Sequence, residues 1–169
     1  YGSGDLRPAP VTNVHTHGAP ESLVTITTTS EKSLRSTPNH IHFAGFRLGI
    51  STQHYFVYLM YKKGMGWRIG VTSVYTKGQK MPMLGFVQRL NHEHGDAIWI
   101  VETHNVIQDA RAREYVLSLN YRVPTLPFIA RKGTSTGGYV PDQTVLDRIF
   151  SEIDTKTGAM KMLRDFNLD

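Results

Sequence analysis

The sequence contains no cysteine among its 169 residues. This absence excludes disulfide bonds, thiolate zinc sites and cysteine nucleophiles. Long apolar runs are also missing, because FVYLMY at 56–61 and AIWIV at 97–101 fall far short of the roughly 20 residues that span a bilayer. No basic segment followed by an apolar stretch opens the chain. We therefore expect no leader peptide, no membrane partner and a cytoplasmic location.

Charged residues are sparse, at 20% of the chain, whereas 40% of the residues are hydrophobic. This balance excludes a disordered polyelectrolyte and predicts a globular chain with a buried core. Lysine and arginine outnumber aspartate and glutamate by 19 to 14, which gives a net charge of +5. Such a modest basic excess suits a polyanionic partner without requiring one.

The first 50 residues favour β structure. Segments rich in valine, isoleucine and threonine at 11–17, 22–29 and 33–43 alternate with period two, and Glu31-Lys32 predicts a hairpin turn. So short a β region is not expected to form a stable domain alone. We predict a β-rich region at 1–50, a second domain at 51–130, and a linker with C-terminal helices at 131–169.

The second domain is predicted to have an α+β fold, with a small three-stranded antiparallel sheet flanked by helices. Periodicity and turn signals place strands and helices along the chain. The predicted strands are 54–61, 67–73 and 96–103, and the predicted helices are 83–94, 105–120, 142–152 and 155–166.

Two helices carry further signals. In the helix at 83–94, spacing predicts that Met83, Val87 and Leu90 face the core. The helix at 105–120 should begin with a capping box made by Asn105 and Gln108.

Glu114 interrupts the apolar face of the helix at 105–120. That face is formed at helical spacing by Ile107, Ala110, Leu117 and Tyr121. A carboxylate on a core-facing stripe is costly unless it is paired, protonated or bound to a cation. Two interpretations remain open: Glu114 lies at the edge of the stripe and reaches solvent or Arg111, or it serves a functional site.

The second domain resembles the GIY-YIG nuclease family in the order and spacing of four features. These features are FVY at 56–58, RIG at 68–70, RLNHEH at 89–94, and a later helix carrying Glu114. The family pattern has GIY, then YIG, an arginine-bearing helix with a nearby histidine, and a metal-binding glutamate. Phe56 replaces the glycine of GIY, and Arg68 replaces the tyrosine of YIG. Glu93 occupies the position where the family has its histidine, which leaves His92 or His94 as the candidate.

The resemblance implies a metal-dependent DNA endonuclease of the homing type. Tyr58 would be the general base or its relay, Arg89 the clamp on the scissile phosphate, and His92 an auxiliary proton-transfer group. Glu114 would be the sole protein ligand of one Mg²⁺ or Mn²⁺ ion, since such hard cations accept a carboxylate and several waters. Arg68 would lower the pKa of Tyr58 or meet a phosphate oxygen, or else it marks a decayed nuclease.

Double-stranded DNA is the partner that the resemblance implies, bound through its backbone phosphates. The residues expected to contact phosphates are Lys62, Lys63, Lys77, Lys80, Arg111 and Arg113. A second hypothesis keeps the fold without the activity, as a DNA-binding or structural remnant.

The N-terminal region resembles the B-block of an intein or Hint domain, a hairpin that ends in Thr-x-x-His. The motif here is Thr37-Pro38-Asn39-His40, within SLVTITTTSEKSLRSTPNHIHF. In that family the threonine and histidine orient and protonate the peptide bond at a splice junction. Because the chain has no cysteine, the resemblance implies an intein fragment that cannot splice. Residues 147–169 are similar to the segment that follows the nuclease insert in inteins of bacterial DNA helicases.

Overall fold

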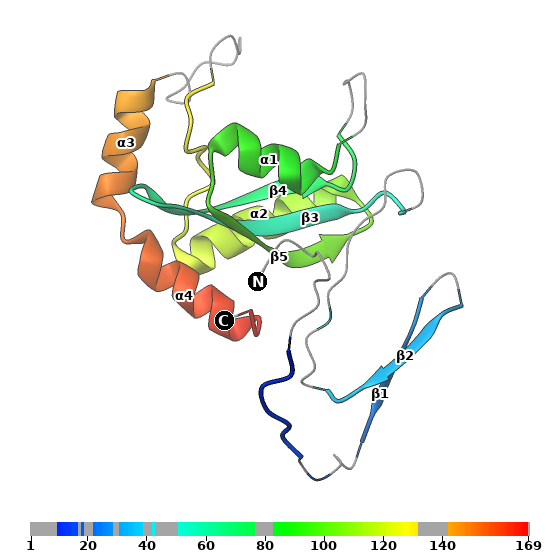
Figure 1. Ribbon diagram of the computed structural model, residues 1–169. Helices are drawn as coiled ribbons and strands as arrows, with labels where there is room; N and C mark the ends of the chain where they lie inside the picture. Colours follow the sequence, from blue (N-terminus) through cyan, green and yellow to red (C-terminus); the bar gives the residue numbers. More distant parts are fainter. Residues whose placement is uncertain are drawn as a thin grey trace. The chain divides into compact units, whose positions relative to one another are not determined.

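A computed structural model gives the fold of the chain in two compact units, Tyr1–Gly45 and Phe46–Asp169 (Figure 1). The C-terminal helices belong to the second unit, together with the larger sheet. The residues that the structure describes are 10–16, 18, 22–28, 31–38, 42, 51–76, 83–131 and 142–168.

The first unit contains a hairpin of two short antiparallel strands, β1 (Val24–Thr27) and β2 (Ser33–Ser36). Glu31 lies in the turn between them with a positive φ of 62°. The predicted hairpin is therefore confirmed. The strand predicted at 11–17 is wrong over residues 10–16, which are exposed and form no strand. Period-two alternation alone therefore does not make a strand of this segment.

The second unit is built on a three-stranded antiparallel sheet in the order β4-β3-β5. β3 (Tyr55–Lys62) is central, with β4 (Gly66–Ser73) and β5 (Ala97–His104) at the edges (Figure 1). Residues 56–60 of β3 are at most 1% exposed, because both faces of the central strand are covered. The predicted α+β fold with a three-stranded antiparallel sheet is confirmed.

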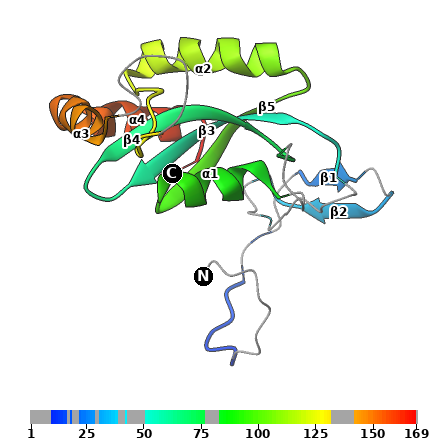
Figure 2. The same cartoon turned by 90° about the horizontal axis from the view of Figure 1, so that it is seen from above.

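Helices pack on both faces of this sheet (Figure 2). α2 (Ile107–Tyr121) covers one face and α1 (Gly85–Glu93) the other. One apolar cluster joins Val57 and Leu59 of β3 to α2, and the other joins Tyr58 to residues of α1 and of the loop that follows α2. Alternation along β3 therefore sends Tyr58 to the α1 side of the sheet.

α1 presents only part of the face that spacing predicted, since Leu90 alone of the three packs against the cluster that contains Tyr58. Met83 precedes the helix and Val87 is 36% exposed, whereas Gly85 and Glu93 are buried. A Cβ on Gly85 would collide with the backbone of Ser73, so the glycine lets α1 pack closely on β4. Close packing at the start of the helix turns Glu93, rather than Val87, toward the interior.

The predicted capping box of α2 is also wrong. The N-cap residue is Val106, and no side chain caps the helix. The side-chain oxygen of Asn105 lies 2.9 Å from the His54 ring nitrogen, and this bond joins two segments that are distant in sequence. The Asn105 side chain, which the local sequence assigned to the helix cap, therefore forms a tertiary hydrogen bond instead.

The two C-terminal helices, α3 (Gln143–Glu152) and α4 (Thr155–Asp165), lie close to the predicted positions. Each begins after an aspartate, Asp142 or Asp154, whose carboxylate accepts backbone N–H groups of the first turn. α4 buries Met162 in the same core cluster as α2. No helix in the described residues combines the length and apolar character needed to cross a membrane.

Candidate active site

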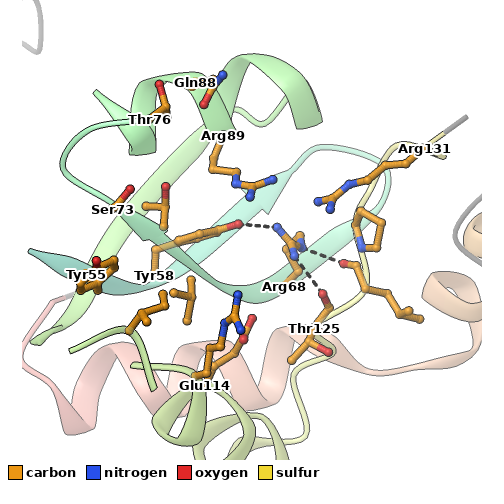
Figure 3. A pocket seen from close by; sticks show the side chains of 16 residues that line it. Tyr55, Tyr58, Arg68, Ser73, Thr76, Gln88, Arg89, Glu114, Thr125 and Arg131 are labelled. Atoms are coloured by element: carbon orange, nitrogen blue, oxygen red, sulfur yellow. Dashed lines mark hydrogen bonds between the residues drawn. The ribbon is translucent and has the colours of Figure 1, made fainter. Parts of the chain in front are cut away.

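A concave site of about 570 Å³ lies beside the edge strand β4, between α1 and α2 (Figure 3). Its walls come from β3, β4, both helices and the loop at 124–131. The charged residues that line it are Arg68, Arg89, Arg111, Arg131 and Glu114. Four guanidinium groups and one carboxylate give the site a net positive charge, which favours an anionic ligand.

Tyr58 reaches this site from the central strand. Its ring lies over Gly70, its cross-strand partner, where a Cβ would collide with the phenol. The tyrosine follows a register shift in the β3–β5 pairing, at which Val101 of β5 is the extra residue. Tyr58 is 1% exposed, and its hydroxyl accepts a hydrogen bond of 2.6 Å from Nη1 of Arg68. The hydroxyl is therefore held in one position.

Arg68 links β4 to the loop after α2. Its Nε donates to the carbonyl oxygen of Leu126 at 2.7 Å, and its Nη2 donates to that of Thr125 at 2.8 Å. With the bond to Tyr58, three of the five guanidinium N–H groups are occupied inside the protein. Arg68 is 4% exposed, so most of its hydrogen-bonding capacity positions the phenol and the loop.

Glu93 lies beneath the same loop and was not expected in the site. Its Oε1 is 2.9 Å from Nη2 of Arg131 and 3.7 Å from Nη1 of Arg68, and its Oε2 accepts the Phe128 N–H at 2.7 Å. Burial raises the pKa of this carboxyl, but the Arg68 charge and the bonds from Arg131 and Phe128 outweigh burial and hold the pKa below its usual value. The sequence offered one signal for this position: Glu93 follows Leu90 by three residues, which places both on the inward side of α1.

Glu114 lines the opposite wall, on α2, and is half-buried. Burial raises the pKa of its carboxyl. The charges of the neighbouring Arg68, Arg111 and Arg89 and the Val71 N–H lower it, without cancelling the effect of burial. The Arg111 charge acts on Glu114, as the first interpretation expected. The carboxylate also points into the site (Figure 3), but a functional role stays a prediction.

Arg89 faces the site from α1 (Figure 3), and Arg111 lines it from α2. Neither forms a hydrogen bond or an ion pair with any residue in the described ranges. Their guanidinium groups are therefore better placed than that of Arg68 to bind an anionic ligand.

The other predicted residues lie elsewhere. His92 is exposed on α1 and does not line the site with Tyr58. Arg113 is bound to Glu102 by two nitrogens, with Nη2 to Oε1 at 2.6 Å, which excludes it from the site. Lys62 donates from Nζ to the carbonyl oxygen of Glu93 at 3.3 Å.

Three of the expected residues, Lys77, Lys80 and His40, lie outside the described residues. Lys63 is exposed in the β3–β4 turn, and Thr37 is half-buried just after β2. The structure therefore brings together Tyr58, Arg68 and three residues from the helices, which are Arg89, Arg111 and Glu114.

Comparisons with protein-family models, with curated proteins and with solved structures found no match to this chain. The function is therefore inferred from the chemistry of the site itself.

Proposed function

We propose that the second unit is a divalent-metal-dependent endonuclease that hydrolyses phosphodiester bonds of double-stranded DNA. The supporting observation is that Tyr58, Arg89 and Glu114 line one arginine-rich site. These residues come from β3, α1 and α2, and they are the ones that the GIY-YIG resemblance selects. The order of elements, two strands, a helix, a strand and a helix, is consistent with a domain of that type.

Binding of the scissile phosphate is assigned to Arg89 and Arg111. A guanidinium group donates two parallel hydrogen bonds to phosphate oxygens, and it stabilises the charge that develops as the phosphorus is attacked. Because the two arginines stand on opposite walls, a phosphate between them would be held from both sides. Arg68 supports the site indirectly, by fixing Tyr58 and the loop.

Tyr58 is assigned to proton transfer. Its oxygen already accepts a bond from Arg68, so its own O–H group remains to donate into the site or to a water molecule there. A fixed phenol can orient the attacking water and pass on its proton.

A single magnesium or manganese ion fits the donor set of the site. The described residues contain no cluster of three or more His, Cys, Asp or Glu side chains, and Glu114 is the one carboxylate among the lining residues. Mg²⁺ usually retains several waters and binds one or two carboxylates together with substrate phosphates. When bound, the ion would stabilise charge on the phosphate and acidify a water.

We also propose that the first unit is an intein-derived hairpin. Support comes from β2, which ends at Ser36, directly before the Thr-x-x-His motif that begins at Thr37. With this origin, the second unit would be the nuclease insert.

A plasmid-nicking assay tests the proposed activity. The wild type should relax supercoiled plasmid in Mg²⁺ or Mn²⁺ and lose this activity in EDTA. Glu114→Gln should cut at least 100-fold more slowly while it still binds DNA, since the cation acts mainly in the transition state. Glu152→Gln, which removes an exposed carboxylate of α3, is the matched control and should cut like the wild type.

Unchanged cutting by Glu114→Gln would show that this residue holds no metal. A wild type that binds DNA but cuts in neither metal would instead support the second hypothesis, a DNA-binding remnant without activity.

A further inference from the structure

A second concavity of about 370 Å³ adjoins the candidate active site. It is lined by His92 and Glu93 of α1 and by the loop residues Ile129 and Ala130. Arg89 and Arg131 line both hollows, so the two adjoin at these guanidinium groups. A ligand with more than one phosphate could contact both.

Arg131 is held in place at this junction. Its Nη2 donates to Oε1 of Glu93 at 2.9 Å, and the other oxygen of Glu93 accepts the N–H groups of Phe128 at 2.7 Å and Ile129 at 3.3 Å. Glu93 is 2% exposed, whereas the Arg131 side chain is 44% exposed. One edge of the guanidinium group is therefore anchored on a buried carboxylate, and the side chain lines both hollows; Figure 3 shows it directed into the first.

The anchoring leaves an excess of positive charge. The two hollows are lined by four guanidinium groups, those of Arg68, Arg89, Arg111 and Arg131, and by two carboxylates, Glu93 and Glu114, which leaves two positive charges. Arg68 donates its hydrogen bonds to other groups of the protein, whereas Arg89 and Arg131 both line the two hollows. A cation that is already held in place loses less side-chain conformational entropy when it binds a phosphate.

We propose that this second concavity is a phosphate subsite, in which Arg131 binds the phosphate next to the scissile one on the same strand. The inference rests on the proposed function and makes it more specific. A nucleic-acid strand carries a phosphate at every nucleotide, so two contiguous cationic hollows suit a polynucleotide and not a mononucleotide. Arg131 is then a substrate-positioning residue that the motifs of the sequence did not indicate.

The salt dependence of DNA binding tests this subsite. The full chain is titrated with a labelled duplex oligonucleotide in EDTA, which prevents metal-dependent cutting, at several salt concentrations. Arg131→Gln should lower the slope of log affinity against log salt by about 0.9, the value for one phosphate contact. A slope difference of that size corresponds to roughly eightfold weaker binding at 0.1 M salt if the affinities meet at 1 M. Arg148→Gln, on α3 and outside both hollows, should match the wild type.

The choice of variants separates binding from folding. Glutamine is shorter than arginine and does not reach the position of Nη2, so the melting temperature of Arg131→Gln is measured and the titrations are made well below it. Arg131→Lys keeps the charge, and it should retain the wild-type salt slope. If Arg131→Gln has the same slope as Arg148→Gln, or if the wild type shows no salt-dependent binding, the subsite is disproved.

Two further outcomes are distinguishable. If the slope falls as expected but the wild type never nicks DNA, the proposed hydrolysis fails while the subsite stands. If inorganic pyrophosphate displaces the duplex equally well at the same phosphate concentration, the groove recognises paired phosphates in general, and the assignment to a nucleic-acid strand is overturned.

Discussion

At the scale of single residues, two neighbouring glutamates have side-chain pKa values that are shifted in opposite directions. Glu93 is buried and receives hydrogen bonds and opposite charge from both arginines and backbone. Glu114 is half-buried, and the arginines around it do not compensate for its loss of water. A well-paired carboxylate suits a structural role, whereas one that is poorly compensated is better suited to bind an additional cation.

Glu93→Ala should destabilise the second unit by about 3 kcal/mol, because it leaves Arg68 without its nearest opposite charge and removes an acceptor from the Phe128 N–H. Urea denaturation followed by tryptophan fluorescence would measure this loss. The control is Glu152→Ala, which is exposed and should change the free energy of unfolding by less than about 0.5 kcal/mol. An equal effect of the two substitutions would contradict the role of Glu93.

Glu114→Gln should raise thermal stability at pH 7, and the gain should diminish as the pH falls toward 4. Burial raises the pKa of Glu114 in the folded state above its unfolded value of 4.5, so the native protein binds the proton more tightly. The cost of the buried charge is therefore present at neutral pH and is removed once the folded-state carboxyl is protonated. Melting temperatures of both proteins across pH 4–7 would reveal this trend, and a gain independent of pH would exclude it.

At the scale of elements, the site follows from the way in which the edge of β4 is covered. The outward N–H of Ile69 donates to the carbonyl oxygen of Pro124 at 2.9 Å, and that of Val71 lies close enough to the Glu114 carboxylate to lower its pKa. An edge strand needs such partners for its backbone groups. The loop after α2 and the helix α2 supply these groups at the edge of β4. A hollow remains between the loop and the helix, and side chains from both faces of the sheet line it.

Gly70→Ala should destabilise the protein by about 1–3 kcal/mol, because its methyl group would meet the ring of Tyr58. A double-mutant cycle measured by urea denaturation tests this cause. In a Tyr58→Ala background the ring is absent, and the same substitution should cost less than about 1 kcal/mol. If both backgrounds lose the same free energy, the contact between the two residues is not responsible.

At the scale of the whole molecule, both apolar clusters are formed by residues between 55 and 168, all within the second unit. In the β1–β2 hairpin of the first unit, Ile26 and Leu34 are exposed at 43% and 51%. We therefore expect the second unit to keep its stability without the first.

Removal of residues 1–45 should leave a chain that unfolds cooperatively within about 2 °C of the full-length midpoint, a difference of well under 1 kcal/mol. Differential scanning calorimetry would compare the two chains, and DNA binding at low salt should persist. A much lower midpoint would show that the first unit stabilises the second.

The sequence by itself determined the kinds of element in the second unit and their approximate places. The periods of two and 3.6 residues are local properties, so they located β3, β4, β5 and the four helices without knowledge of the fold. The motif spacing also selected Tyr58, Arg89 and Glu114, which share one site in the structure. Their chemical roles remain predictions.

The tertiary structure alone decided which other groups complete the site. Glu93 and Arg131 form an ion pair although 38 positions separate them in sequence, and Arg68 bonds to carbonyl groups 57 and 58 positions away. Asn105 and His54 are joined in the same way, at the expense of the expected helix cap. Such contacts depend on how elements pack rather than on the period of any one of them, because a buried polar group takes the partner that the fold brings within reach.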